Sequence, residues 1–331
     1  MKKYHIYGLG AALVDTEIQV TDTDLNDMQV EKGQMTLVDE QRRKELMEAL
    51  AGHLVHSKRA SGGSAGNTII AASYFGAKTF FSGKVAADEN GDFYMKDMQD
   101  AGVTTAKVAP EGGVTGKCLI LITPDAERSM NTFLGASENF STRELDLSAI
   151  ADSEYVYIES YLVTSDSGRA AAIQARETAQ ANGTKVAVSF SDPGIVSFFK
   201  DGIKEILGGK VELVFCNKDE ALSFADTEDL DTAIDILKTV ADEFVITLGA
   251  EGALVYRQGQ SFKTDGVSVD AVDTNGAGDM YAGAYLYAIT QGAAREKAAK
   301  FASHCAATVV SQFGPRLQAE QYAPLLKNLD G

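Results

Sequence analysis

Short apolar runs alternate with amphipathic segments over the second half of the chain, and this alternation constrains the fold more than any other feature. The apolar runs are residues 155–158, 185–188, 212–215 and 244–248, and the helical patterns are residues 166–181, 195–207, 218–225 and 229–240. Strand–helix–strand order of this kind predicts a parallel sheet that is covered by helices on both faces. We expect the run at residues 4–14 to join that sheet. The chain is therefore predicted to be an α/β protein with a doubly wound sheet.

Two stretches interrupt the alternation, at about residues 15–37 and 104–134. Both contain short apolar runs separated by turn residues, which predicts antiparallel strands without intervening helices. We expect these insertions to form a small β-sheet lid on one domain that spans residues 1–331, because lids exclude water from a site when they close. An exposed strand edge on such a lid would also allow the protein to form a homodimer.

Charge and cysteine content exclude several classes of partner. Asp and Glu outnumber Lys and Arg by 47 to 30, and the resulting net charge of −17 repels nucleic acid and anionic membrane surfaces. Cys118, Cys216 and Cys305 form no CxxC pair, so we expect three buried, reduced thiols rather than disulfides or a zinc site. No apolar run approaches the ~20 residues of a membrane span, and no signal-like segment is present. A cytoplasmic protein with small-molecule ligands is expected.

The glycines at the first strand match a dinucleotide-binding motif only in part. Gly8 and Gly10 resemble the start of the Rossmann fingerprint, but the third glycine would fall at Leu13. A helix should also follow that glycine, whereas the segment TEIQVT has the pattern of a strand. The sequence therefore does not favour an NAD-linked oxidoreductase.

The segment DTNGAGD at residues 273–279 is the strongest chemical motif in the chain. A glycine-rich turn opens there onto the small, apolar helix pattern of residues 278–290. Free N–H groups at a helix start, together with the positive end of the helix dipole, make an anion hole. Asp279 stands in the first turn, where the dipole favours its ionised form and lets it accept a proton. An anion hole beside a carboxylate base suits phosphoryl transfer to a hydroxyl group.

A second glycine-rich segment, SGGSAGN at residues 61–67, also leads into a helix of small residues. Glycines allow backbone N–H groups to approach a ligand, although an ordinary loop before a buried helix fits the pattern as well. No Gly-Lys-Ser/Thr follows, so the segment is not a Walker A loop. Asp15 follows the first strand at the expected ligand crevice, where it either binds a vicinal diol or is a solvated turn residue.

Three further positions suggest a nucleotide site. Asn217 follows the apolar run 212–215 and has Glu220 at the spacing of a capping box, which fits both a helix cap and an organiser of magnesium and phosphate. The segment TLGAEG at residues 247–252 again places glycines at the end of a strand. His304 lies in the C-terminal amphipathic pattern of residues 294–312, where it either lines an adenine pocket or packs against neighbouring side chains.

Two of these segments, SGGSAGNT and DTNGAGDMYAGAYL, resemble the signature segments of the ribokinase (PfkB) carbohydrate-kinase family. NKDE and ITLGAEG fall in the family order, so the resemblance covers nearly the whole chain. Within the family, TGKCLILITPDAERSMNTFLGAS and VELVFCNKDEALSFA are most similar to adenosine kinases. The resemblance implies a ribokinase-like fold with a β-sheet lid, ATP and Mg²⁺ as cofactors, and often a stimulating monovalent cation such as K⁺.

The resemblance also implies roles for individual residues. Asp279 matches the catalytic base, and Arg128 matches a lid residue that reaches the transferring phosphoryl group. The positions of the anion hole are Gly276, Ala277 and Gly278. The positions that hold the ribose hydroxyls are Asp15, Gly63 and Asn67. The positions that organise phosphate and magnesium are Asn217 and Glu220, with Glu220 acting on Mg²⁺ through water. The positions that border ATP are Thr247, Gly249, Gly252 and His304.

The expected reaction is the ATP-dependent phosphorylation of the 5′-hydroxyl of a ribonucleoside, adenosine above others, which gives AMP and ADP and belongs to purine salvage. The apolar positions expected to hold the nucleobase are Met35, Leu119, Leu134 and Leu162. Ala11 and Ala12 stand where animal-type adenosine kinases carry asparagine and proline, which leaves nucleoside selectivity open but not the phosphoryl chemistry. The alternatives are a sugar kinase of the same family, for ribose or fructose, and a binding protein that lacks catalysis.

Overall fold

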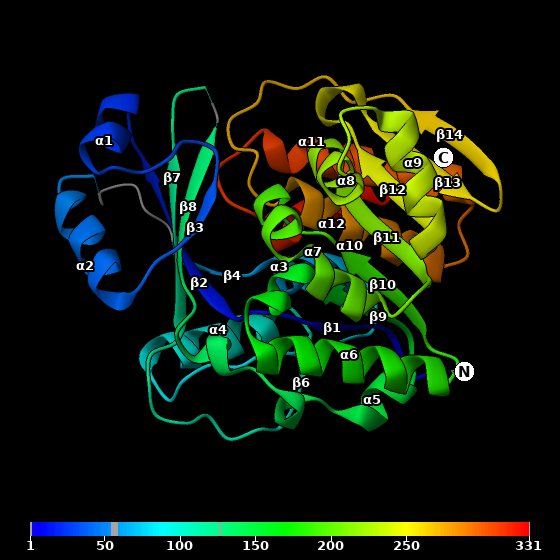
Figure 1. The fold of residues 1–331 in the computed structure, drawn as a ribbon, viewed down its shortest axis with the longest axis horizontal. Coiled ribbons are helices and arrows are strands. Elements are labelled where there is room, and N and C mark those ends of the chain that lie inside the picture. Colours follow the sequence, from blue (N-terminus) through cyan, green and yellow to red (C-terminus); the bar gives the residue numbers. More distant parts are fainter. Residues whose placement is uncertain (1, 54–58, 126, 331) are drawn as a thin grey trace.

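The computed structural model describes residues 2–53, 59–125 and 127–330, and it contains two sheets (Figure 1). The larger sheet has nine strands. In spatial order they are β14 (Gln260–Thr264), β13 (Ala253–Arg257), β12 (Ala241–Thr247), β11 (Val211–Asn217), β10 (Lys185–Ser189), β9 (Ser153–Glu159), β1 (Tyr4–Leu9), β5 (Thr79–Ser82) and β6 (Thr104–Thr105). All neighbours from β12 to β6 are parallel, whereas β13 and β14 add an antiparallel edge. The predicted α/β fold is confirmed.

Two apolar cores lie on opposite faces of the larger sheet, because side chains alternate along each strand. One core contains residues of α3 (Ser64–Tyr74), α4 (Glu89–Asp100), α10 (Ala277–Thr290), α11 (Arg295–Val310) and α12 (Ala319–Leu325), and α13 (Lys327–Asp330) packs against it. The other contains residues of α5 (Leu147–Ala151), α6 (Asp166–Ala181), α7 (Pro193–Leu207), α8 (Lys218–Ala225) and α9 (Leu230–Val240). Short 3-10 helices lie at Gly135–Asn139, Thr142–Glu144, Ser160–Thr164 and Gly249–Glu251. The strands are therefore covered on both faces, as near-continuous apolar runs require.

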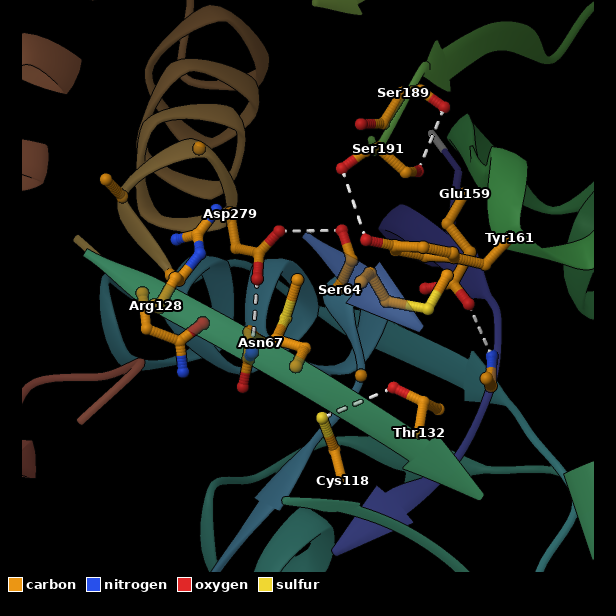
Figure 2. A pocket seen from close by; sticks show the side chains of 18 of the residues that line it. Ser64, Asn67, Cys118, Arg128, Thr132, Glu159, Tyr161, Ser189, Ser191 and Asp279 are labelled. Carbon is orange, nitrogen blue, oxygen red and sulfur yellow. Dashed lines mark hydrogen bonds between the residues drawn. The ribbon is translucent and has the colours of Figure 1, made fainter. Parts of the chain in front are cut away.

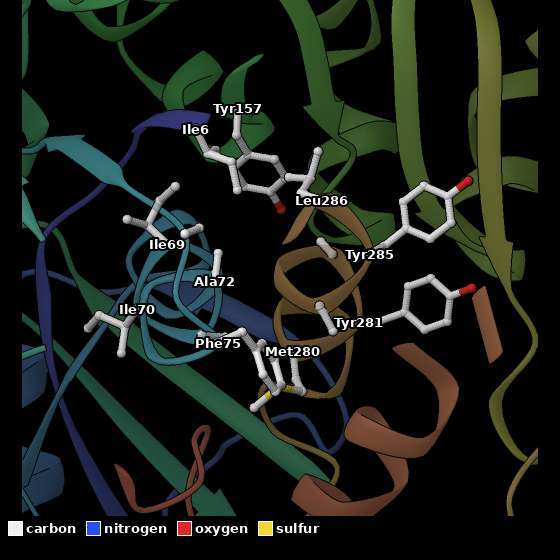
Figure 3. Packing of buried hydrophobic residues seen from close by; sticks show 14 of the residues in the cluster. Ile6, Ile69, Ile70, Ala72, Phe75, Tyr157, Met280, Tyr281, Tyr285 and Leu286 are labelled. Carbon is white, nitrogen blue, oxygen red and sulfur yellow. The ribbon is translucent and has the colours of Figure 1, made fainter. Parts of the chain in front are cut away.

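The two helices that begin at the glycine-rich segments, α3 and α10, pack against each other (Figure 3). Their approach is close because both are rich in small residues. A side chain at Gly283 of α10 would place a Cβ atom 2.6 Å from the carbonyl oxygen of Thr68 on α3. Ile69, Phe75 and Met280 lie in the apolar core around this crossing. The packing brings the N-termini of α3 and α10 together at the carboxyl ends of the central strands of the larger sheet.

The smaller sheet has five strands in the order β3 (Met35–Leu37), β8 (Arg128–Phe133), β7 (Gly116–Ile122), β2 (Leu13–Gln19) and β4 (Arg59–Gly62). The β7–β8 pair is antiparallel as expected, and β2–β4, which was not predicted, is antiparallel too, whereas β2–β7 and β3–β8 are parallel. The expected insertions supply β3, β7, β8 and residues 15–19 of β2, while β4 lies outside them and β6 joins the larger sheet. Most of the run at 4–14 forms β1, whereas Leu13 and Val14 already belong to β2.

A short helix within the first insertion corrects the prediction that it contains strands alone. α1 (Asp22–Asp27) forms because Thr21 and Asp24 make a capping box, in which each side chain accepts a hydrogen bond from the backbone amide of the other residue. Leu25 of α1 then packs with Leu46 of α2 (Glu40–Ala49) on the outer face of the smaller sheet. The polar residues of this segment are typical of a turn, and the prediction did not recognise the capping box of Thr21 and Asp24. Within the described residues, no helix is long and apolar enough to cross a membrane.

Candidate active site

A pocket lies between the carboxyl ends of the central strands and the inner face of the smaller sheet (Figure 2). Its volume is about 290 Å³, close to the lower bound of ~300 Å³ for small-molecule sites. Leu13, Met35, Ile120, Met130 and Leu134 supply an apolar wall. Polar groups from the glycine-rich turns, β9, β10 and β11 form the opposite wall. The pocket therefore combines an apolar surface with convergent polar groups, as ligand sites do.

Asp279 stands at the third position of α10, and its carboxylate is held by two side chains of α3. Ser64 Oγ donates to Oδ1 at 2.6 Å, and Asn67 Nδ2 donates to Oδ2 at 3.1 Å (Figure 2). Burial raises the pKa of Asp279 above its ordinary value, while these hydrogen bonds and the charge of Arg128 act in the opposite direction. Asp279 is thus an oriented carboxylate at the positive end of a helix dipole.

The turn before α10 leaves the start of the helix without a side-chain cap. Gly276 adopts φ 74°, and a Cβ atom there would lie 2.1 Å from the carbonyl oxygen of Pro315. Asp273 stabilises the turn, because its carboxylate accepts hydrogen bonds from the amides of Asn275 (2.8 Å) and Gly314 (3.0 Å). The amide of Ala277 makes a long contact of 3.4 Å with the carbonyl oxygen of Thr274. The turn thus presents the weakly engaged N–H group of Ala277 close to Asp279.

The first turn of α3 faces the same part of the pocket. Gly63 precedes the helix with φ 85°, and a Cβ atom there would lie 2.1 Å from the carbonyl oxygen of Ala11. Ser64 and Asn67 are three residues apart, so both side chains project on one face of the helix toward Asp279. Asn67 Oδ1 is buried and has no hydrogen-bond partner within the described residues. Sequence reasoning missed Ser64, although its helical spacing from Asn67 was a usable signal.

Asp15 of β2 is 4 % exposed and lines the pocket beside Gly63 and Asn67. Its carboxylate packs directly on Gly62, where a Cβ atom would come within 2.0 Å. Burial raises the pKa of Asp15 well above its ordinary value, Glu17 adds to that rise, and Arg316 opposes it. A buried carboxylate that faces a pocket is most stable when a ligand hydroxyl donates to it. The structure thus places Asp15 in the pocket, and its burial excludes the alternative of a solvated turn residue.

Arg128 of β8 brings a positive charge to the same turn. Its Nη1 donates to the carbonyl oxygen of Thr274 at 2.6 Å, and the side chain lines the pocket. Asn275 Nδ2 also donates to Glu17 of β2 at 3.3 Å. Two strands of the smaller sheet therefore contact the turn before α10.

Asn217 and Glu220 form the capping box that their spacing predicted. Asn217 donates through Nδ2 to Glu220 Oε1 at 2.8 Å and through its amide to Oε2 at 2.9 Å, and Asn217 Oδ1 accepts from the amide of Glu220 at 2.8 Å. Burial raises the pKa of Glu220 to about 8. Both residues line the pocket with Thr247 and Gly249. The helix-cap interpretation is confirmed, and the role as an organiser of phosphate stays a prediction.

Four of the predicted site residues lie outside the pocket lining. Leu119 points to the outer face of the smaller sheet, because alternation gives the inner face to Cys118 and Ile120. Leu162 is buried in the core beside α6 and α7. Gly252 packs against the backbone of Thr264, and His304 is exposed on α11, where its Nδ1 lies 3.0 Å from the carbonyl oxygen of Lys300.

Several lining residues were not predicted. Glu159 is the last residue of β9, Tyr161 follows it, and Ser189 and Ser191 stand at the end of β10. The rule that ligands bind at the carboxyl ends of parallel strands was the signal that could have found them. Cys118, Cys216 and Cys305 are buried free thiols as expected, although Cys118 and Cys216 also line the pocket.

Comparison with known proteins places this fold and site in a class. The model of the pfkB family of carbohydrate kinases matches residues 35–321. The probable sugar kinase from Rhizobium etli is 30% identical, with a TM-score of 0.93 over 99% of this chain and 100% of that chain. The adenosine kinase from Sinorhizobium meliloti is 32% identical, with a TM-score of 0.92 over 97% of this chain and 99% of that chain. The chain therefore belongs to the pfkB family and is a phosphotransferase.

Its similarity to adenosine kinases extends beyond bacteria. The adenosine kinase of Saccharomyces cerevisiae is 28% identical over 333 residues, which cover 95% of this chain and 96% of that relative. The similarity therefore includes both glycine-rich segments and both sheets rather than one motif. The names of these relatives divide between adenosine and sugar kinases, so the names alone do not identify the acceptor.

Proposed function

We propose that this protein transfers the terminal phosphoryl group of ATP to the 5′-hydroxyl of a ribonucleoside, with adenosine as the first candidate. The observation that carries the proposal is the continuous pocket in which Asp279 and Asp15 face an apolar sheet surface. A nucleoside has both parts that such a pocket matches, because its ribose is polar and its base is a flat, largely apolar ring. The smaller sheet is proposed to act as the lid of one kinase domain.

The ribose would be held at the start of α3. Asp15 offers a buried carboxylate, and Asn67 Oδ1 is an unpartnered acceptor within the described residues. Gly63 borders the pocket, and a side chain there would clash with the carbonyl oxygen of Ala11. Two acceptors at one end of a pocket suit the vicinal hydroxyls of a ribose, since each hydroxyl can donate one hydrogen bond.

The nucleobase would lie against the inner face of the smaller sheet. Met35, Ile120, Met130 and Leu134 line this face and present flexible or branched apolar side chains. A purine would cover this surface, whereas a single sugar ring would leave much of it exposed to water. Closure of the lid over the base would also exclude water and so suppress hydrolysis of ATP.

Asp279 would accept the proton of the 5′-hydroxyl as it attacks the phosphoryl group in line. The hydrogen bonds from Ser64 and Asn67 fix the carboxylate before the substrate arrives, so little reorganisation is needed in the transition state. The amides of residues 276–278 would stabilise the equatorial oxygens. Arg128 would move from the carbonyl oxygen of Thr274 to the transferring group, where it would offset the developing negative charge.

The other end of the pocket would hold ATP, bordered by Thr247 and Gly249. The chemistry of this end of the pocket suits Mg²⁺, because Glu220 is a buried carboxylate in the lining and Mg²⁺ prefers oxygen ligands. When bound, Mg²⁺ would neutralise charge on the phosphates and would be held by Glu220 through water. Asn217 would orient Glu220 through the two hydrogen bonds that its backbone amide and its side-chain amide donate to the Glu220 carboxylate.

A sugar kinase is the second candidate. It is supported by the 30% identity to a probable sugar kinase and by hydroxyl groups of Thr164, Ser189 and Ser191 in the pocket. The discriminating experiment is ADP release by the purified protein with Mg-ATP and K⁺, with adenosine, other ribonucleosides, ribose and fructose at equal concentrations. Turnover with ribose or fructose well above that with adenosine would overturn the nucleoside proposal and leave the fold assignment intact.

A further inference from the structure

Glu159 is a fully buried carboxylate at the end of β9, and both of its oxygens bond to the backbone. Oε1 accepts from the amide of Ala11 at 2.6 Å, and Oε2 accepts from the amide of Ala65 at 2.6 Å. Its side chain is 0 % exposed by area and lines the pocket. The two amides belong to segments that are far apart in sequence, so the carboxylate is a bridge between them.

The first of these segments is the connection between the two sheets. β1 ends at Leu9 in the larger sheet, and β2 begins at Leu13 in the smaller one. Residues 10–12 cross between them, and Glu159 reaches over Gly10, where a Cβ atom would lie 2.4 Å from the carboxyl carbon. The position of this crossing sets the start of β2, which carries Asp15. The connection is thus fixed to the larger sheet through Glu159.

The second segment is the first turn of α3. This helix has no side-chain cap at Gly63, so its first amides need other acceptors. Glu159 supplies one at Ala65 and brings negative charge to the positive end of the helix dipole. The same turn carries Ser64 and Asn67, which hold Asp279. Displacement of this turn would therefore move both residues that orient Asp279.

We propose that Glu159 is a positioning residue that fixes the acceptor-binding start of β2 and the Asp279-orienting turn of α3 relative to each other. This inference rests on the phosphotransfer proposed above, because it assigns Asp15, Asn67 and Asp279 to that reaction. Glu159 itself need not touch the reacting atoms. Its contribution is a geometric one, since phosphoryl transfer is sensitive to small errors in the placement of the attacking hydroxyl.

The surroundings of Glu159 support a role beyond simple packing. Burial raises its pKa to about 7, Asp279 adds to that rise, and the hydrogen bonds from Ala11 and Ala65 oppose it. The phenol groups of Tyr94 and Tyr157 also lie close enough for the charge of Glu159 to raise their pKa values. A buried carboxylate is costly to maintain, and no cation offsets it among the causes that shift its pKa. The two amides are therefore the groups that hold it there.

Glu159→Gln is the informative variant, because it keeps the size of the side chain and replaces one acceptor oxygen with a donor NH₂ group. That group would face an N–H donor, so one of the two bridging bonds is lost. We expect the acceptor KM to rise about tenfold while the KM for ATP stays within about twofold. Glu144→Gln is the control, although Glu144, unlike Glu159, also pairs with Lys84 at 3.1 Å. Glu144 is also buried and accepts from a backbone amide, that of Ser141, but it lies outside the pocket.

Hydrogen exchange supplies a readout that does not depend on catalysis. The amides of Ala11 and Ala65 should exchange faster in Glu159→Gln and remain protected in Glu144→Gln. An acceptor KM that is unchanged, or KM values for ATP and acceptor that rise by the same factor, would overturn the positioning role. If the wild-type protein phosphorylates no acceptor, the proposed function fails. In that case, hydrogen exchange still tests whether Glu159 bridges the two segments. Unchanged protection of the amides of Ala11 and Ala65 in Glu159→Gln would show that it does not.

Discussion

Arg128 Nη1 lies 2.6 Å from the carbonyl oxygen of Thr274, so a strand of the smaller sheet contacts the turn that precedes α10. The guanidinium group is close enough to Asp279 to oppose the rise in its pKa. The smaller sheet and the proposed anion hole are therefore linked by a charged side chain. Because of this link, we propose that the Arg128 guanidinium contacts the phosphoryl group during transfer.

Replacing Arg128 should slow transfer more than it weakens binding of the acceptor. We expect Arg128→Ala to lower kcat by about 10–100-fold with a small change in the acceptor KM, because the charge acts mainly on the transition state. Arg128→Lys keeps the charge without the planar fork and should recover part of the loss. Steady-state kinetics of the two variants test this, and equal kcat values for Arg128→Ala and wild type would remove Arg128 from the mechanism.

Asp279 carries the proposed proton transfer. Asp279→Asn should lower kcat by about 10²–10⁴-fold while the Kd for ATP, measured by calorimetry, stays within about twofold. The asparagine can still bond to Ser64 and Asn67, so the site geometry should be largely kept. Near-normal turnover in this variant would exclude Asp279 as the base.

A substitution at Gly276 tests whether the turn before α10 contributes to catalysis. Gly276→Ala introduces a residue at φ 74° and a Cβ atom 2.1 Å from the carbonyl oxygen of Pro315, so the turn must shift. We expect a loss of about 1–3 kcal/mol in the free energy of unfolding together with a large fall in kcat. Gly292→Ala is the control, because Gly292 has φ 85° but open space around its Cβ position. That variant should lose stability and retain kcat, and a similar fall in kcat for both would argue against a special role for the turn.

The raised pKa of Glu159 predicts a pH-dependent stability. Its pKa rises from 4.5 to about 7 on folding, so the folded protein binds this proton more readily than the unfolded chain does. The stability that it contributes is fully present below about pH 4.5 and is lost as the pH rises through 7. Relative to Glu159→Gln, the free energy of unfolding of the wild-type protein should fall by about 3 kcal/mol as the pH rises across that window.

Urea unfolding of the two proteins between pH 5 and 8 measures this difference. The raised pKa of Glu220 affects both proteins alike and therefore cancels in the comparison. Parallel stability curves would show that Glu159 does not titrate in this range.

The features that the sequence predicted are those encoded locally. The apolar runs became strands, the two glycine-rich segments became helix starts, and the spacing of Asn217 and Glu220 became a capping box. In each case the residues that determine the structure lie within one strand or one turn. The family resemblance added roles to these positions but not the contacts between them.

The features that the sequence did not predict depend on distant contacts. Glu159 bonds to Ala11 across 148 residues, and Ser64 bonds to Asp279 across 215. Leu119 was expected to face the ligand, but the pairing of Cys118 with Asp15 gives that face to its neighbours. A strand pattern alone does not say which alternate face meets the pocket. That choice required the register between β2 and β7.

The central claim is transfer to the 5′-hydroxyl of a nucleoside, and a comparison of adenosine with 5′-deoxyadenosine tests it most directly. The measurement is ADP release with Mg-ATP, together with identification of the phosphorylated product by mass spectrometry. The account predicts AMP from adenosine, and competitive inhibition without acceptor-dependent ADP release by 5′-deoxyadenosine, which fills the pocket but lacks the attacking hydroxyl. Phosphorylation of 5′-deoxyadenosine, or no turnover and no binding of adenosine, would contradict it.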